Sequence, residues 1–215
     1  MLIPTVQPPF PLRWGFTTRL DAPDAAPPVR LKQMHGCDIH KATGLPQAGD
    51  GLWTTTPGEP IGVRVADCVP ILLAGLADDT PWVAALHAGW RGAVGGILRR
   101  GVSLFLERGG RPEELVWALG PAIRRCHFEV GPEVIQAARK DPAWHEDLAT
   151  QDPSGNGFFD LHGFLRAQAL DLGMDPAKDG SILRCTRCEP DLFYSYRGGD
   201  TEGRQWGWIR IDGDQ

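Results

Sequence analysis

Two histidines and one cysteine stand at the ends of apolar, strand-like segments, each just before a turn. His35 follows the letters KQM, Cys68 follows VAD, and His87 follows AAL. Imidazole and thiolate groups are ligands that zinc prefers, and three protein ligands leave the open coordination position that a catalytic zinc site requires. Because the three residues are far apart in the sequence, only the fold can bring them together, so their convergence is a hypothesis.

The segment around His87 also contains a candidate anion site. The unbroken apolar run 83–86 predicts a buried strand that ends at His87, two glycines then permit a turn, and helical periodicity follows. Exposed N–H groups at the start of a helix attract an anion, and Arg91 adds a positive charge beside them. The alternative is that His87 is hydrogen-bonded at a strand end and Arg91 pairs with a surface carboxylate.

Asp67 and Arg19 extend this group of residues. Asp67 could orient a ligand histidine or act as an acid or base. Adjacent strand residues point to opposite faces, so Asp67 and Cys68 can both face a metal only if the strand has ended or bulged there. Arg19 ends a predicted strand and could help to neutralise a phosphate, and the alternative for it is a surface ion pair.

The other cysteines and histidines predict little chemistry. Five cysteines without a regular framework are typical of reduced thiols. Cys185 and Cys188 form a Cys-x-x-Cys pair, but a structural zinc site would need two more ligands, so we expect neither a metal nor a redox role for them. The other candidates, Cys37 and Cys126, are remote in sequence and are expected to be small buried residues. Solvated or hydrogen-bonded side chains are expected at His40, His127, His145 and His162, with His162 on the outward face of a helix.

Length and composition are typical of a globular enzyme. The chain has 215 residues, 42% hydrophobic and 23% charged, and we expect a single domain over 1–215. A net charge of −5 argues against nucleic acid or a membrane surface as partner. No apolar run approaches the roughly 18 residues of a membrane span, and the N-terminus does not resemble a signal peptide. We therefore expect a cytoplasmic location.

The elements that must position these residues alternate along the chain. Strands are expected over 12–18, 28–34, 38–43, 61–67, 69–74, 82–87, 115–119, 181–186, 192–196 and 206–211, and helices over 92–108, 132–140 and 160–172. The Ala-, Pro- and Asp-rich stretch 22–28 is expected to be an exposed loop. Strands outnumber helices and several are short and adjacent, which predicts an α+β fold with mixed sheets.

Six ordered blocks of sequence resemble the YfiH-like family. The sharpest is HAGWRG (87–92), and the others are GFTTR (15–19), QMHG (33–36), ADCVPILL (66–73), GPAI with FEVG (120–131), and the C-terminal CT, FYSYR and GR (185–204). The matches cover residues 14 to 211. Members of this family carry several names: multicopper polyphenol oxidase, peptidoglycan editing factor and purine nucleoside phosphorylase.

This resemblance implies an α/β/β/α fold and a zinc-dependent purine nucleoside phosphorylase that could also deaminate adenosine. Its partners would be a purine nucleoside and phosphate, its metal zinc, with copper as a second possibility. The implied site has metal ligands His35, Cys68 and His87, catalytic residues Cys68, Arg91 and Asp67, and substrate or phosphate contacts from Arg19, Arg91 and Gln33. Two departures bear on substrate preference: segment 20–29 is short, and Arg197 is followed by two glycines rather than a second arginine.

Three other functions remain open. Cys68 could be the nucleophile of a hydrolase with a histidine base, as in the cysteine-hydrolase toxins whose fold is likened to this family and as the peptidoglycan-editing name suggests. The chain could also be a non-catalytic metal-binding module. A copper oxidase is least favoured, because laccase chemistry needs several coppers and paired His-x-His ligands, which none of the six histidines forms. The sequence does not determine how many chains assemble.

Overall fold

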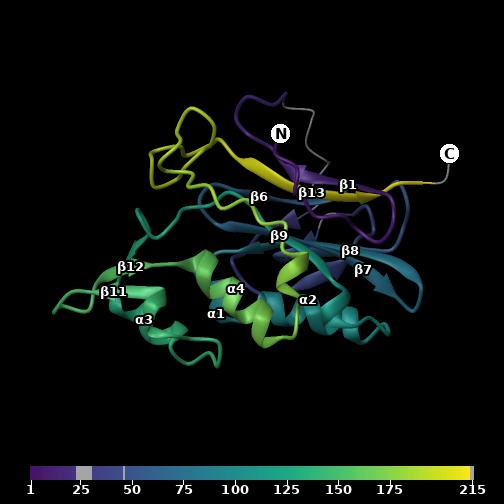
Figure 1. Cartoon of the computed structure of the whole chain (residues 1–215). Helices are drawn as coiled ribbons and strands as arrows, with labels where there is room; N and C mark the ends of the chain where they lie inside the picture. Colours follow the sequence, from purple (N-terminus) through teal and green to yellow (C-terminus); the bar gives the residue numbers. More distant parts are fainter. Residues whose placement is uncertain (23–30, 46, 214–215) are drawn as a thin grey trace.

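Two stacked sheets form the centre of the molecule (Figure 1). The computed structural model describes residues 1–22, 31–45 and 47–213. The five-stranded sheet has the order β3 (Ile39–Lys41), β5 (Gly51–Thr54), β8 (Thr80–Ala88), β7 (Val69–Ala77) and β9 (Val116–Leu119). The three-stranded sheet has the order β1 (Leu12–Phe16), β13 (Gln205–Ile211) and β6 (Ile61–Val65). Two small sheets pair β2 (Leu31–Lys32) with β4 (Gln47–Ala48), and β12 (Gly157–Phe159) with β10 (Glu129–Val130) and β11 (Ala149–Gln151).

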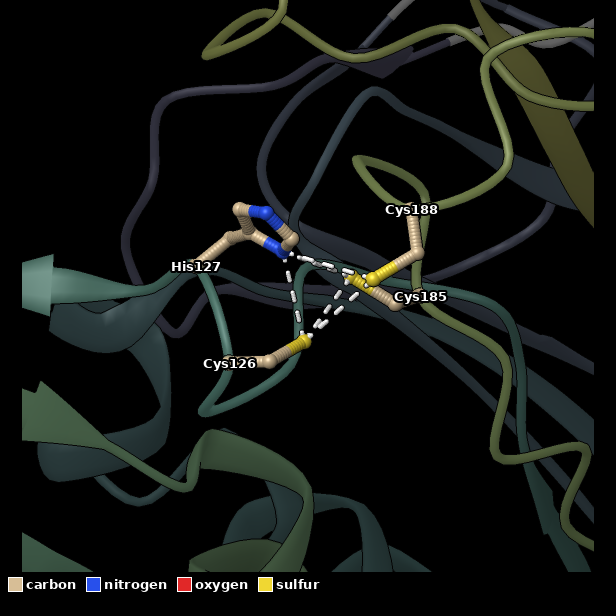
Figure 2. Close-up of side chains that lie close together, drawn as sticks. All are labelled: Cys126, His127, Cys185 and Cys188. Atoms are coloured by element: carbon tan, nitrogen blue, oxygen red, sulfur yellow. Dashed lines mark hydrogen bonds between the residues drawn. The ribbon is translucent and has the colours of Figure 1, made fainter.

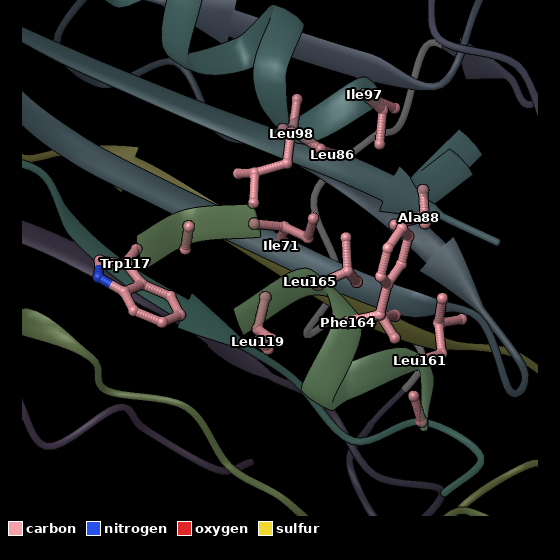
Figure 3. Packing of buried hydrophobic residues seen from close by; sticks show 14 of the residues in the cluster. Ile71, Leu86, Ala88, Ile97, Leu98, Trp117, Leu119, Leu161, Phe164 and Leu165 are labelled. Carbon is pink, nitrogen blue, oxygen red and sulfur yellow. The ribbon is translucent and has the colours of Figure 1, made fainter. Parts of the chain in front are cut away.

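Strands β7 and β8 consist almost entirely of apolar residues because both faces of their sheet are covered. One face, which includes Leu72 and Ala85, packs against the three-stranded sheet. The other face, which includes Ile71 and Leu86, packs against the helices, as Figure 3 shows. Alternate residues of one strand therefore serve two separate cores.

The helices are α1 (Trp90–Val94), α2 (Ile97–Leu106), α3 (Pro132–Ala138) and α4 (Leu161–Asp171). The predicted mixed α+β class is confirmed. Within the described residues, however, helices cover only the five-stranded sheet (Figure 1), so the second helical layer of the expected α/β/β/α order is not formed by this part of the chain. Along β13 buried and half-exposed residues alternate, consistent with an outer sheet face that is partly open to solvent.

The helix predicted over 92–108 is two helices. Gly96 adopts a left-handed conformation with φ +84°, which breaks the hydrogen-bond ladder between α1 and α2. The helices predicted over 132–140 and 160–172 are present as α3 and α4. The Asp160 carboxylate caps α4 by accepting a hydrogen bond from the Gly163 N–H, and Gly173, at φ +81°, follows its end.

The strands predicted over 181–186 and 192–196 are wrong. Gly180 and Ile182 donate backbone hydrogen bonds to β9, but the chain then turns at 185–188. At Tyr194 the side-chain amide of Gln205 bonds both backbone groups and so takes the place of a partner strand. The short strands β4, β5 and β10–β12 were not predicted. Of the strand expected over 28–34, the described residues 31–34 contain β2 at 31–32. Residues 23–30, including most of the expected loop, lie outside the described residues. No described helix is long and apolar enough to cross a membrane.

Candidate active site

The three predicted ligands lie together at one end of the β7–β8 hairpin. In the antiparallel register Pro70 pairs with His87, so Cys68, just before β7, comes next to the end of β8. His35 approaches from the loop that follows β2, and its ring meets the ring of His87 edge-on at 4.8 Å between centroids. The ligand atoms of His35, Cys68 and His87 all lie within 4.8 Å of one another. This spacing allows a single metal ion to reach all three.

A buried carboxylate that the sequence did not reveal organises this cluster. Asp50 accepts a hydrogen bond from Nδ1 of His87 at 2.8 Å and from the backbone N–H groups of Met34, His35 and Gly36 at 3.2, 2.9 and 2.7 Å. These bonds hold the backbone of His35 in a left-handed conformation, φ +60°. They also fix Nδ1 of His87 as the protonated nitrogen, so that Nε2 is free to bind a metal. The only hint in the sequence is a lone aspartate between two glycines.

The pKa values reflect this arrangement. Burial would raise the pKa of Asp50, but the hydrogen bonds from His87 and Gly36 outweigh it and lower that pKa. Burial would likewise raise the pKa of Cys68, yet hydrogen bonds from His35 and His87 lower it to about 7. Burial would lower the pKa of His87, and its bonds to Asp50 and Cys68 instead raise it to about 9. A thiolate and two imidazoles with a carboxylate behind one of them form a donor set that fits zinc.

Asp67 faces the same cavity as Cys68 because the chain has left the strand at that point. Strand β6 ends at Val65, and Asp67 has a left-handed φ of +85°. One carboxylate oxygen accepts a hydrogen bond from the Thr186 hydroxyl at 2.6 Å and the other from the backbone N–H of Arg197 at 2.8 Å. Asp67, the residue before Cys68, therefore holds Thr186 and Arg197 near the cluster. Asp50, by contrast, contacts the ligand histidine His87 directly.

The cluster opens into a cavity of about 810 Å³. Six predicted site residues line it: Gln33, His35, Asp67, Cys68, His87 and Arg91. The sequence assigned no role to the aromatic residues Trp90, Phe128 and Tyr196, or to the cationic residues Lys32, Arg64, Arg197 and Arg204, which also line it. The C-terminal pattern FYSYR was visible, but nothing in it indicated that Tyr196 and Arg197 face the same cavity as Cys68, which is far away in the sequence.

Arg91 lies within α1 rather than ahead of it. Its guanidinium carbon is 4.3 Å from the centre of the Trp90 ring, and its side chain is exposed. No carboxylate within 1–22, 31–45 and 47–213 forms an ion pair with it. Because α1 has only five residues, its backbone offers little of the predicted anion seat, and any anion contact depends on the Arg91 side chain.

Arg19 and Gln33 have partners within the protein. Arg19 donates two hydrogen bonds of 2.9 Å to Asp200 and lies over the Tyr194 ring, and it is not among the residues that line the cavity. Gln33 lines the cavity, but its amide exchanges two hydrogen bonds of 2.8 Å with the backbone of Arg64. This pair joins the loop that carries His35 to the three-stranded sheet.

Two expectations for the other histidines and cysteines are wrong. His162 is buried, not outward-facing, and its Nε2 bonds the Gly120 carbonyl at 2.8 Å because α4 turns this side toward the segment after β9. Cys126 is exposed, not a buried filler, and lies with His127 beside Cys185 and Cys188. Only the tertiary structure brings these two loops together.

Two histidines and one cysteine that could hold a metal ion thus line a large cavity, and sequence comparisons show the family of the chain. Residues 15–212 match the family model described as multi-copper polyphenol oxidoreductase laccase, and the chain belongs to this family, which includes the YfiH proteins. It is 38% identical to "Purine nucleoside phosphorylase YfiH" of Shigella flexneri over 186 residues, 85% of this chain and 73% of that protein. It is 34% identical to "Adenosine deaminase RL5" from an unknown prokaryotic organism, covering 79% of this chain and 69% of that protein.

Solved structures agree. The fold matches the Bacillus licheniformis hypothetical protein YfiH with a TM-score of 0.79 and 29% identity, covering 86% of this chain and 74% of that one. YlmD from Geobacillus stearothermophilus matches with a TM-score of 0.76 and 31% identity over the same shares. The resemblance expected from the sequence blocks is thereby confirmed.

Proposed function

We propose that this protein is a zinc-dependent purine nucleoside phosphorylase that cleaves adenosine or inosine with phosphate. The observation that carries the proposal is a three-ligand cluster that opens into a cavity lined by both aromatic and cationic side chains. Three ligands leave one coordination position for a substrate group. The names of the relatives supply the substrate class.

The residues of the cavity divide into two functional groups. Trp90 and Tyr196 line the cavity with rings that are not fully buried, and a purine can stack on them. Arg91 and Arg197 offer guanidinium groups that suit phosphate, whose oxygens match the geometry of the fork. Bound at His35, Cys68 and His87, zinc would supply a Lewis acid beside the substrate. Asp50 holds the ring of His87 in the orientation that this requires.

Phosphorolysis breaks the bond between the base and C1′ of the ribose and joins C1′ to a phosphate oxygen. The protein must therefore hold the anion on one side of the sugar and the purine on the other. Arg91 neighbours the aromatic Trp90 in the same helical turn, so the cavity offers a cation close to an aromatic ring. The exposed guanidinium of Arg91 can meet phosphate without first breaking an internal ion pair with any described carboxylate.

The test is an inosine assay with and without phosphate on zinc-loaded protein. We expect hypoxanthine and ribose 1-phosphate only when phosphate is present, and loss of both after chelation. Ribose rather than its phosphate ester would show a hydrolase instead. Activity that survives complete removal of metal would overturn zinc dependence and favour Cys68 as a free nucleophile.

Adenosine deamination is a second candidate because one relative carries the name adenosine deaminase. The same protein given adenosine without phosphate would release inosine and ammonia. Copper oxidation fits the residues poorly. In the described part of the chain, histidine and cysteine ligands form two separate groups, one with two histidines and one with a single histidine. A multicopper centre requires more histidine ligands than either group offers.

A further inference from the structure

We propose that Cys126, His127, Cys185 and Cys188 form a second, structural metal site that binds zinc. This site would fix the C-terminal loop, residues 181–204, beside the active site. The four side chains come from two turns about 60 positions apart and point toward one another (Figure 2). None of them lines the cavity. The proposal goes beyond the proposed function and does not depend on it.

The distances suit a tetrahedral zinc centre. The Cys126 sulfur lies 3.6 Å from that of Cys185 and 3.5 Å from that of Cys188. Nδ1 of His127 lies 3.3, 3.9 and 3.4 Å from the sulfurs of Cys126, Cys185 and Cys188. Zinc at ordinary bond lengths would place two sulfurs about 3.8 Å apart and a sulfur about 3.5 Å from a nitrogen. The five distances therefore cluster around those of a bound Cys₃His site.

The type and number of ligands indicate a structural role. Cys₃His with a Cys-x-x-Cys pair is a combination that structural zinc sites use, and four protein ligands leave no position for a substrate. A disulfide is the competing use of these thiols. It would bring one pair of sulfurs to about 2.05 Å and leave the third thiol and the histidine without a role. All five cysteines of the chain are free in this structure.

The surroundings supply positive charge. Three thiolates around one Zn²⁺ leave a net negative charge, which nearby cations stabilise. Arginines precede the ligands in both turns: Arg124 and Arg125 before Cys126, Arg184 before Cys185 and Arg187 before Cys188. The acidic Glu189 follows Cys188 and pairs with Arg184. Arg124 and Arg125 donate hydrogen bonds to backbone carbonyls of Leu183 and Asp147, which keeps them at the surface near the cluster.

The C-terminal loop is held by individual contacts rather than by regular secondary structure. Residues 181–204 form neither a helix nor a strand apart from one isolated bridge between Ala122 and Cys185. The backbone groups of Ala122 bond those of Arg184 and Thr186, so hydrogen bonds already bring the two turns together. The side chains of Cys126, His127 and Cys188 are nevertheless exposed, and burial of apolar surface does not explain why they point toward one another. A metal that binds only when the two turns have met would add its binding free energy to the stability of the folded chain.

The loop leads directly to the active site. Thr186, between the two cysteines of the pair, is buried and donates its hydroxyl to Asp67, the neighbour of Cys68. Further along, the backbone N–H of Arg197 bonds the other oxygen of Asp67, and Tyr196 and Arg197 line the cavity. His127 precedes Phe128, which also lines it. The second metal would thus hold several cavity residues in place without touching the substrate.

The experiment counts zinc per chain by mass spectrometry after reduction and removal of loosely bound metal. We expect two zinc ions in the wild type, one in the double variant C126S/C188S and one in C68S. The control C37S alters a thiol outside both clusters, and we expect it to keep two. The double variant should also melt at a lower temperature, and mild oxidation should leave the wild-type thiols of this cluster unreacted while zinc is bound.

Cobalt substitution keeps the proposal testable if the double variant does not fold. Each cobalt-bound thiolate contributes a near-ultraviolet charge-transfer band, and three of the four expected thiolates belong to the second cluster. The wild-type band should therefore fall by only about a quarter in C68S. A wild-type chain whose only zinc is lost in C68S, a Cys126–Cys188 disulfide in the fresh protein, or a cobalt band abolished by C68S would each overturn the proposal.

Discussion

The two clusters of metal-ligand side chains differ in ligand number, surroundings and exposure. His35, Cys68 and His87 offer three ligands at one end of the buried β7–β8 hairpin. Asp50 is hydrogen-bonded to His87, and the cluster faces a cavity. The second cluster, Cys126, His127, Cys185 and Cys188, offers four ligands on two turns and does not line that cavity. Three protein ligands leave a coordination position open for a substrate, as in catalytic zinc sites. Four protein ligands fill the coordination of zinc, as in sites that stabilise the fold. Under our two proposals, the number and surroundings of the ligands distinguish a reactive site from a structural one within one chain.

The strongest way to break this comparison is Cys68→Ser. We expect phosphorolysis to fall by about 10³-fold or more, because a neutral hydroxyl replaces thiolate poorly at zinc and a Lewis acid supplies several kcal/mol to the transition state. One zinc per chain should disappear while the second remains. Steady-state kinetics together with metal content decides the point. A variant with full zinc but no activity would show that Cys68 is a nucleophile rather than a ligand.

Asp50→Asn should have the second-largest effect. The carboxylate accepts four hydrogen bonds, and an amide nitrogen in its place would oppose some of the N–H donors. We expect zinc affinity at the active site to fall by roughly 10- to 100-fold, as for other partners that orient a ligand histidine.

Competition with a coloured chelator measures this affinity, and the second zinc should be unaffected. Asp38→Asn is the matched control, because Asp38 is exposed and pairs only with Arg100 among the described residues. Equal loss of both metals from the Asp50 variant would mean that the residue supports the fold as a whole rather than one site.

Arg91→Lys should have a smaller, selective effect. Lysine keeps the charge but loses the fork, so the KM for phosphate should rise roughly tenfold, the equivalent of about 1.4 kcal/mol. The melting temperature should change little, since Arg91 pairs with no described carboxylate. Arg99→Lys provides the contrast, because Arg99 bonds the largely buried Asp141 and should lose stability instead. An unchanged phosphate KM with a large drop in melting temperature would make Arg91 structural.

His162 belongs to neither cluster and should affect activity least. Burial lowers its pKa to about 4, although the Gly120 carbonyl partly opposes this. In the unfolded chain His162 therefore becomes protonated near pH 6.5, whereas in the folded chain it becomes protonated only near pH 4. This contribution to stability is complete above pH 6.5 and is lost as the pH falls toward 4, by roughly 3 kcal/mol.

Urea unfolding of metal-free protein between pH 7 and 4.5 measures this loss. His162→Gln should retain activity at pH 7 and show a shallower decline with acid than the wild type. Identical declines in the two proteins would mean that the acid sensitivity arises elsewhere, for example at the two ligand clusters.

The sequence alone identified the ligand types, the family blocks and the strong periodic elements. His35, Cys68 and His87 could be named because each ends an apolar run, and α3 and α4 because a proline at the first turn, an aspartate cap and regular apolar spacing are local signals. The break between α1 and α2 was missed because a helix with two adjacent glycines can continue or bend, and packing decides which.

The tertiary structure decided the contacts between residues remote in the chain. Asp50 reaches His87 because β5 pairs with β8, and Cys126 meets Cys188 because the segment after β9 runs beside the C-terminal loop. A single polar residue or a lone Cys-x-x-Cys has no periodic neighbour to indicate its partner. Such contacts depend on strand order and register, which arise from burial of the two cores as a whole and are not written in the local sequence.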